Sequence, residues 1–96
     1  MQAFARDGAV CIRQLLRPDE VKLLTRGIDT NLAQPSPRAK VASRRDDPGF
    51  FIEDFCNWQH NDDYRHVIFN SALAPAAARL MGSSTVRLYH DHMLTK

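Results

Sequence analysis

Residues 86–96 read VRLYHDHMLTK and gather two histidines, an aspartate and a lysine into one run. Successive side chains of a β-strand point to opposite faces. A strand over this stretch would therefore carry on one face Leu88, His90, His92, Leu94 and Lys96. Two imidazoles and an ammonium group are unusual on the face of a core strand, because a buried charge needs a partner. We predict that this face lines a cavity.

Upstream of that strand, the sequence predicts three helices. The first begins at Pro18, because proline is tolerated in the first turn and the acidic Asp19 and Glu20 favour the positive end of the helix dipole. Its apolar stripe has spacings of three and four and consists of Val21, Leu24, Ile28 and Leu32. A second helix is predicted from Asn61, as N-cap, to Phe69, with Tyr64, Val67 and Ile68 buried. A third is predicted over residues 72–81, with Gly82 placed to end it.

Two further strands are predicted, over residues 9–13 and 50–55. Residues 35–49, PSPRAKVASRRDDPG, hold three prolines and four basic side chains, and we expect a flexible loop. Two interpretations of this loop stay open. Its basic residues steer an anionic substrate, or they belong to a solvated connection whose charge is partly offset by Asp46 and Asp47. These basic residues are Arg38, Lys40, Arg44 and Arg45.

Length and composition indicate one small domain over residues 1–96, since a 96-residue chain with 44% hydrophobic residues buries only a modest core. The formal net charge of +2 predicts no polyanionic partner, so no nucleic acid is expected. The N-terminus lacks the apolar core of a signal peptide, and no stretch approaches the ~20 apolar residues of a membrane span. We therefore expect no membrane partner and a cytoplasmic location.

The two cysteines, Cys11 and Cys56, show no CxxC or other regular spacing. Each has apolar neighbours, so we expect small buried residues with free thiols in a reducing compartment. One tripeptide, His60-Asn61-Asp62, matches the His-x-Asp pattern of an iron site. It lies where a helix is predicted to begin, and residues two apart on a helix diverge by about 200°. We do not interpret it as a metal site.

Three segments together resemble a known family. Residues 88–96 (LYHDHMLTK), residues 80–82 (LMG) and residues 4–10 (FARDGAV) look like the N-terminal part of the phytanoyl-CoA dioxygenase family. This resemblance implies a parent enzyme that uses Fe(II) and 2-oxoglutarate, is built on a double-stranded β-helix, and hydroxylates a small or acyl-type substrate. In that family the iron-binding His-x-Asp lies a short way beyond the position of residue 96. No catalytic or metal-binding residue is therefore expected in this chain, which by itself would be inactive and would hold no cofactor.

The resemblance implies a role for Lys96, which looks like the family's lysine that contacts 2-oxoglutarate. Because that co-substrate chelates iron through one end, its far carboxylate needs a cation held on a rigid strand. For His90 and His92 two interpretations stay open: they line the cavity wall without ligating metal, or they are paired polar residues at a sheet edge. Asp91 would point to the opposite face.

The expected fold class is α+β, with N-terminal helices and the first strands of an incomplete double-stranded β-helix. The alternative function comes from another class: a small α+β binding or interaction module without catalysis, which engages a partner through a strand edge or the basic loop. No Gly-x-Ser-x-Gly elbow, phosphate-binding loop or zinc spacing is present in the sequence, so hydrolase and nucleotide-binding functions have no motif to support them.

Overall fold

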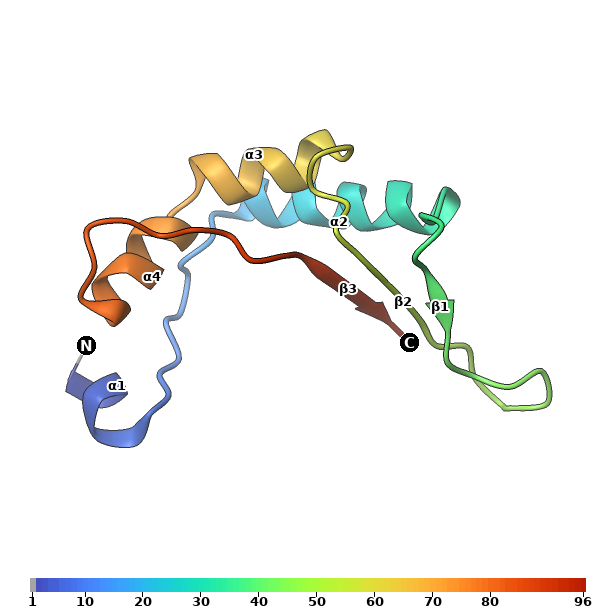
Figure 1. Ribbon diagram of the computed structural model, residues 1–96, viewed down its shortest axis with the longest axis horizontal. Coiled ribbons are helices and arrows are strands. Elements are labelled where there is room, and N and C mark those ends of the chain that lie inside the picture. Colours follow the sequence, from blue (N-terminus) through green and yellow to red (C-terminus); the bar gives the residue numbers. More distant parts are fainter. Residues whose placement is uncertain (1) are drawn as a thin grey trace.

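Two helices, α2 (Pro18–Ala33) and α3 (Asp62–Asn70), lie side by side and form the helical layer of this computed structural model (Figure 1). The structure describes residues 2–96. A three-stranded antiparallel sheet extends from this layer and consists of β1 (Lys40–Val41), β2 (Ile52–Phe55) and β3 (His92–Thr95). Within the described residues the fold class is α+β, as the sequence predicted.

The sheet has the order β1-β2-β3, so β3 is an edge strand. Asp54 pairs with Met93, and both are buried, whereas the next pair along the ladder joins Glu53 to the exposed Leu94. The face that carries Asp54 and Met93 therefore packs against the helices. The opposite face of β2 and β3 is the more exposed one and carries Glu53, Phe55, His92 and Leu94.

The remaining helices, α1 (Gln2–Asp7) and α4 (Leu73–Met81), lie at the end of the molecule away from the β1–β2 loop (Figure 1). The molecule is elongated, with principal extents of 46 × 29 × 24 Å. None of the helices formed by residues 2–96 has the length and apolar character needed to cross a membrane.

The sequence signals at the helix ends are confirmed. At the start of α2, the Arg17 backbone N–H donates to the Glu20 carboxylate at 2.9 Å. Asn61 caps α3, because its side-chain oxygen accepts the Tyr64 N–H at 3.1 Å. After α4, Gly82 adopts a left-handed conformation with φ 64° and ends the helix.

The apolar stripe of α2 is confirmed only in part. Leu24, Ile28 and Leu32 are half-buried, but Val21 is 49% exposed. On α3, Tyr64 and Val67 are buried, and with Ile52 and Met93 they form the apolar core.

Two strand predictions are wrong. Residues 9–13 form no strand in the structure and follow helix α1, which the sequence did not predict. The predicted strand over residues 86–96 is limited to β3, and residues 86–91 are not assigned to a strand. The physical reason is the length of the partner: β2 ends at Phe55, and Cys56, which still donates to the Asp91 carbonyl at 3.0 Å, turns the chain away with φ 64°. A strand lasts only as long as its neighbour can share hydrogen bonds.

The prediction for the cysteines is wrong as well, because Cys11 and Cys56 are both exposed, although both are free thiols. Cys56 lies in the sharp turn after β2, and Cys11 lies in an irregular segment without a sheet to cover it. The predicted loop over residues 35–49 contains a strand of two residues, β1, which pairs with β2. The rest of that segment is irregular.

A buried carboxylate joins the two layers. Asp54 on β2 is 0% exposed, and its oxygens accept hydrogen bonds from the Asn31 side chain at 2.9 Å and from the backbone N–H of Ser36 at 2.7 Å. The Ser36 hydroxyl and the Phe55 N–H also donate to it. Burial raises the pKa of Asp54, but these donors outweigh burial and hold the pKa well below the usual range of an aspartate.

The same network extends to α3. The Tyr64 hydroxyl donates to the Asn31 side-chain oxygen at 3.1 Å, and Asn61 donates to the Gly27 carbonyl at 3.0 Å. Gly27 is buried where α2 and α3 make their close approach. A Cβ atom at this position would lie 2.9 Å from two ring carbons of Tyr64. The packing of the two helices therefore requires glycine here.

We predict that Gly27→Ala destabilises the protein by about 1–2 kcal/mol, because the added methyl group forces Tyr64 or the helix to shift. Helix propensity alone would give the opposite sign, since alanine is favoured over glycine by about 1 kcal/mol in a helix interior. Urea unfolding followed by circular dichroism measures the change. The control is Thr25→Ala on the exposed side of α2, expected to stay within about 0.5 kcal/mol of the wild type. A stabilised Gly27→Ala protein would contradict the packing described above.

Candidate functional site

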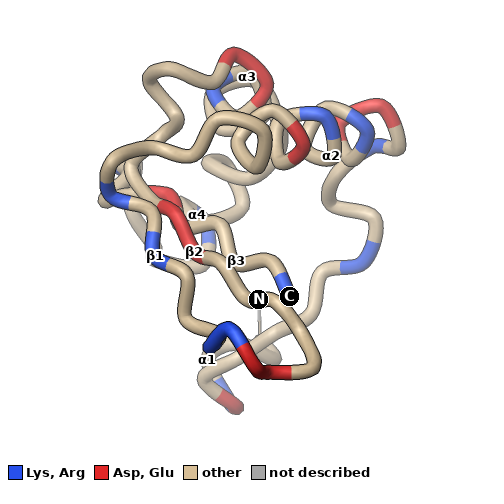
Figure 2. Tube along the Cα trace, turned by 90° about the vertical axis from the view of Figure 1, so that its right-hand side faces the viewer, with Lys and Arg blue, Asp and Glu red and all other residues tan. Residues whose placement is uncertain are grey.

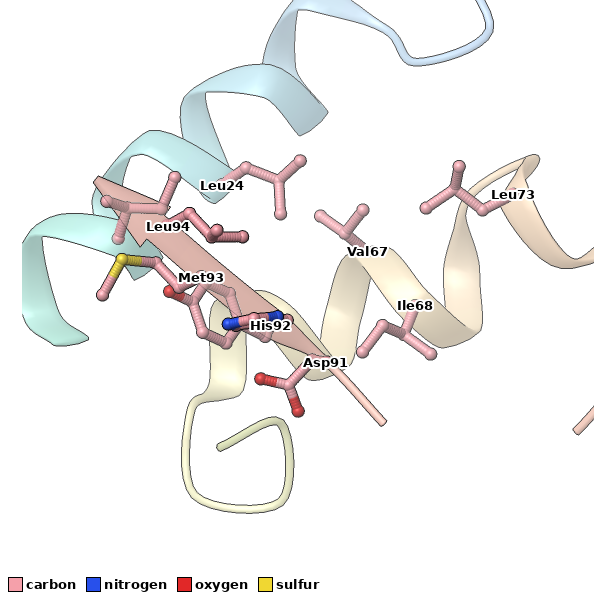
Figure 3. Close-up of a pocket in the computed structure, with 10 residues that line it drawn as sticks. Leu24, Val67, Ile68, Leu73, Asp91, His92, Met93 and Leu94 are labelled. Carbon is pink, nitrogen blue, oxygen red and sulfur yellow. The ribbon is translucent and has the colours of Figure 1, made fainter. Parts of the chain in front are cut away.

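A cavity of about 370 Å³ lies between α2, α3 and β3 (Figure 3). Its wall is mainly apolar: Leu24 of α2 and Val67 of α3 project toward one another, and Met93 of β3 contributes from the sheet. A cavity of this size and composition suits an apolar group of a small molecule or of another chain segment.

The polar groups in the wall of this cavity are already engaged. The Asp91 carboxylate accepts hydrogen bonds from the backbone N–H groups of Asn57 and Trp58, each at 3.0 Å. The Tyr64 hydroxyl donates to Asn31, and burial, followed by the charges of Asp91 and Asp54, raises the pKa of Tyr64 to about 12. Tyr64 thus stays protonated at neutral pH. This cavity is therefore suited to binding an apolar group and not to transferring protons.

The more exposed face of the sheet, opposite Asp54 and Met93, carries a different set of side chains. Nε2 of His92 lies 3.2 Å from Oε2 of Glu53, and the His92 ring meets the Phe55 ring edge-on at 5.6 Å between centroids. Lys96 directly follows β3 and lines a second cavity of about 290 Å³ beneath the β1–β2 loop. The other polar contributors to that second cavity include Ser43 and Asp47.

The structure places the residues singled out from the sequence in different surroundings. His92 and Lys96 belong to the same alternating set on β3, and His92 also lines the cavity between the helices and β3. Lys96 is exposed. His90 precedes β3 on an exposed segment, 6.4 Å from the His92 ring, and lines neither of the two cavities. The three side chains therefore do not surround one common space.

Metal-binding side chains are not clustered within residues 2–96: no group of three His, Cys, Asp or Glu residues there is arranged to hold an ion. In the tripeptide His60-Asn61-Asp62, Asn61 is the N-cap of α3 and Asp62 is its first residue. The iron triad that the family resemblance implies is not provided by the described residues.

The basic residues of segment 35–49 have different surroundings and do not form one cluster. Arg38 is tied to the chain after β2, because its guanidinium donates to the carbonyls of Phe55 and Cys56 at 2.9 and 3.0 Å. Lys40, Arg44 and Arg45 are exposed. Basic and acidic residues are interspersed along the described chain (Figure 2), in agreement with the weak charge bias of the sequence.

The sequence interpretation missed the importance of Asn31, Asp54 and Asn57, which are buried polar residues. One signal was available for Asp54. It shares its strand face with Ile52, so the alternation that buries Ile52 also buries a carboxylate. For Asn31 and Asn57 the sequence offers no comparable signal, because their partners come from elements distant in the chain.

Comparisons of this chain with protein-family models, with curated proteins and with solved structures found no match.

The exposed edge of β3 generates a testable expectation about association. Leu94 is 56% exposed on this edge strand, and an unprotected apolar edge favours pairing with another chain. We predict that Leu94→Lys weakens concentration-dependent self-association, measured by sedimentation velocity. The matched control is Val21→Lys on α2, where a similarly exposed residue lies on a helix. Equal effects of the two variants would show that association does not involve the sheet edge.

Proposed function

We propose that this chain forms the N-terminal scaffold of a non-haem Fe(II) and 2-oxoglutarate dependent dioxygenase, similar to the phytanoyl-CoA dioxygenase family, that hydroxylates a small or acyl-type substrate. The observation that carries the proposal is the position of Lys96. It directly follows β3 and, with residues of the β1–β2 loop, lines the cavity of about 290 Å³.

The different burial of the two sheet faces supports this proposal. In a double-stranded β-helix, the inner faces of the sheets enclose the site and the outer faces are available for helices. Here the face with Asp54 and Met93 is buried toward α2 and α3. The opposite face, with His92 and Lys96, would then point to the interior of the barrel. The segment between β2 and β3 supplies α3 and α4, which stay outside that interior.

The chemistry of Lys96 fits one carboxylate of 2-oxoglutarate. Its ammonium group is a compact cation on a long stem, suited to a charge-assisted hydrogen bond. The cavity beside Lys96 also contains the Ser43 hydroxyl, which accepts the Phe51 N–H at 3.0 Å. Asp47 lines the same cavity, and its carboxylate accepts the Arg44 N–H at 2.6 Å. The cavity thus offers one cation and one hydroxyl near an acid that is already hydrogen-bonded.

Iron itself does not fit the described residues, since no suitable triad exists among residues 2–96. In this proposal the iron ligands come from polypeptide outside these 96 residues, and we assign no step of oxygen chemistry to this chain. Its own contribution is to hold Lys96 directly after an ordered strand and to brace the sheet from the helical side.

The alternative function, an interaction module without catalysis, is favoured by a different observation. The free edge of β3 and the exposed side chains of Leu88 and Tyr89 just before it offer an extended segment on which another strand can pair. The two functions differ in what pairs with the β3 edge. In the oxygenase, strands of the same polypeptide pair with it, whereas in the interaction module a partner protein does.

We predict that Lys96→Gln, made in the protein expressed from its whole coding region, raises KM for 2-oxoglutarate by about tenfold or more, because one hydrogen bond to a charged group is lost. Succinate release measures this constant. The control is Lys40→Gln, an exposed lysine on β1, which should leave KM unchanged.

Two results would contradict the oxygenase proposal. One is a KM for 2-oxoglutarate that is the same in the Lys96→Gln protein and the wild type. The other is a coding region with a stop codon directly after Lys96, instead of an in-frame His-x-Asp within a few tens of residues. The second result would favour the interaction module.

A further inference from the structure

A third cavity, of about 320 Å³, has a polar lining unlike that of the other two. It lies between the C-terminal half of α2, residues 36–38 and the turn at residues 57–61. We propose that this cavity binds a small oxyanion, a carboxylate or a phosphate group. Its size is at the lower end of the range for ligand pockets, so it suits a small metabolite.

The charge of the lining favours an anion. Arg38 and His60 are the residues of this cavity wall that can carry a positive charge, and none of the lining residues is acidic. The others are neutral, and the Gln34 amide brings a hydrogen-bond donor. The wall therefore presents positive charge and donors rather than carboxylates.

Arg38 is held in place before any ligand arrives. Its Nε donates to the Phe55 carbonyl at 2.9 Å, and one terminal nitrogen, Nη2, donates to the Cys56 carbonyl and to the Asn57 side-chain oxygen at 3.0 and 3.1 Å. The other terminal nitrogen, Nη1, makes no hydrogen bond to residues 2–96. A guanidinium fixed in this way loses little side-chain freedom when it binds an anion.

Asn57 connects Arg38 to the buried network. The residue is only 8% exposed, and its side-chain oxygen accepts a hydrogen bond from Nη2 of Arg38 at 3.1 Å. Its side-chain nitrogen, Nδ2, is buried on the side of Asp54, where it helps to lower the pKa of that carboxyl. Asn57 therefore holds the Arg38 guanidinium in place from the buried side, and Nη1 is left for a ligand in the cavity.

The nearby charge of Asp54 does not cancel this preference. Asp54 is not part of the cavity wall, and its oxygens are occupied by Ser36, Asn31 and the Phe55 N–H. Asn31 and Ser36, which do belong to the wall, stand between that carboxylate and the cavity. The charged groups available to a ligand are thus those of Arg38 and His60.

The site is independent of the proposed oxygenase function, because it shares no lining residue with the cavity at Lys96. Binding that depends on Arg38 but not on Lys96 would establish the third cavity alone. Loss of 2-oxoglutarate binding in the Lys96→Gln protein would support the proposed oxygenase function and would say nothing about the third cavity. The two ideas therefore succeed or fail separately.

Titration of the ¹⁵N-labelled protein with inorganic phosphate, and separately with acetate, tests the proposal at ionic strength held constant with sodium chloride. We expect saturable shifts of the Asn57 side-chain NH₂ and the Arg38 Nε–H resonances. Stronger binding of phosphate or of acetate identifies which oxyanion the cavity prefers. Shifts that do not saturate, or that centre on Lys40, Arg44 and Arg45, would overturn the proposal.

A pair of charge-matched variants makes the test sharper. Arg38→Gln should weaken binding of the preferred anion by about tenfold, because a charge-assisted hydrogen bond is lost, while Arg45→Gln, which removes the same charge outside the cavity, should not. Equal losses in both would overturn the proposal. Because the Arg38 guanidinium also donates hydrogen bonds to two backbone carbonyls, circular dichroism must show that the Arg38→Gln protein folds.

Should Arg38→Gln fail to fold, His60→Leu provides the second variant, since His60 is exposed and its ring makes no hydrogen bond to residues 2–96. Binding of the same anion should weaken by about threefold, as expected for one neutral hydrogen bond. An unchanged affinity in a folded His60→Leu protein would overturn the assignment of this cavity.

Discussion

The structure depends on one buried carboxylate. Asp54 of β2 has no exposed surface, and it receives hydrogen bonds from Asn31 of α2 and from Ser36 in the segment that follows α2. Through Asn31 the network reaches the Tyr64 hydroxyl on α3. An aspartate buried this deeply is tolerable only when its oxygens are paired, so both helices must take up defined positions relative to the sheet. With so small an apolar core, this polar network specifies how the layers meet.

The hydrogen-bond network of Asp54 determines which face of the sheet packs against the helices. Because Asp54 and Met93 face the helices, the alternation along β3 places His92 and Leu94 in the more exposed set, and Lys96 directly follows the strand. The helical side contains the apolar cavity and, at the C-terminal half of α2, the polar cavity with Arg38. The cavity at the β1–β2 loop contains Lys96, the cation on which the oxygenase proposal rests, and it shares no lining residue with the other two cavities.

Local signals were sufficient for α2, α3, α4 and β2, but not for α1. Pro18, the Asn61 cap and Gly82 act through neighbouring backbone groups, so the sequence itself contains the information. The extent of β3 was overestimated because a strand ends where its partner ends, and the left-handed turn at Cys56 is not visible as a sequence pattern. The polar cavity was missed because Arg38 and Asn57 meet only in three dimensions. Alternation could have revealed Asp54, since Ile52 lies on the same face.

The most direct test of this account is the titration of Asp54 in the folded protein, followed by the ¹³C resonance of its side-chain carboxyl. A pKa depressed below the unfolded value of about 3.9 means that Asp54 contributes stability above that pH, and that this contribution is lost as the pH falls toward the folded pKa. We predict that Asp54 stays ionised well below this unfolded value. A titration midpoint of Asp54 at or above the unfolded value would contradict the account, because its donors would then not outweigh burial.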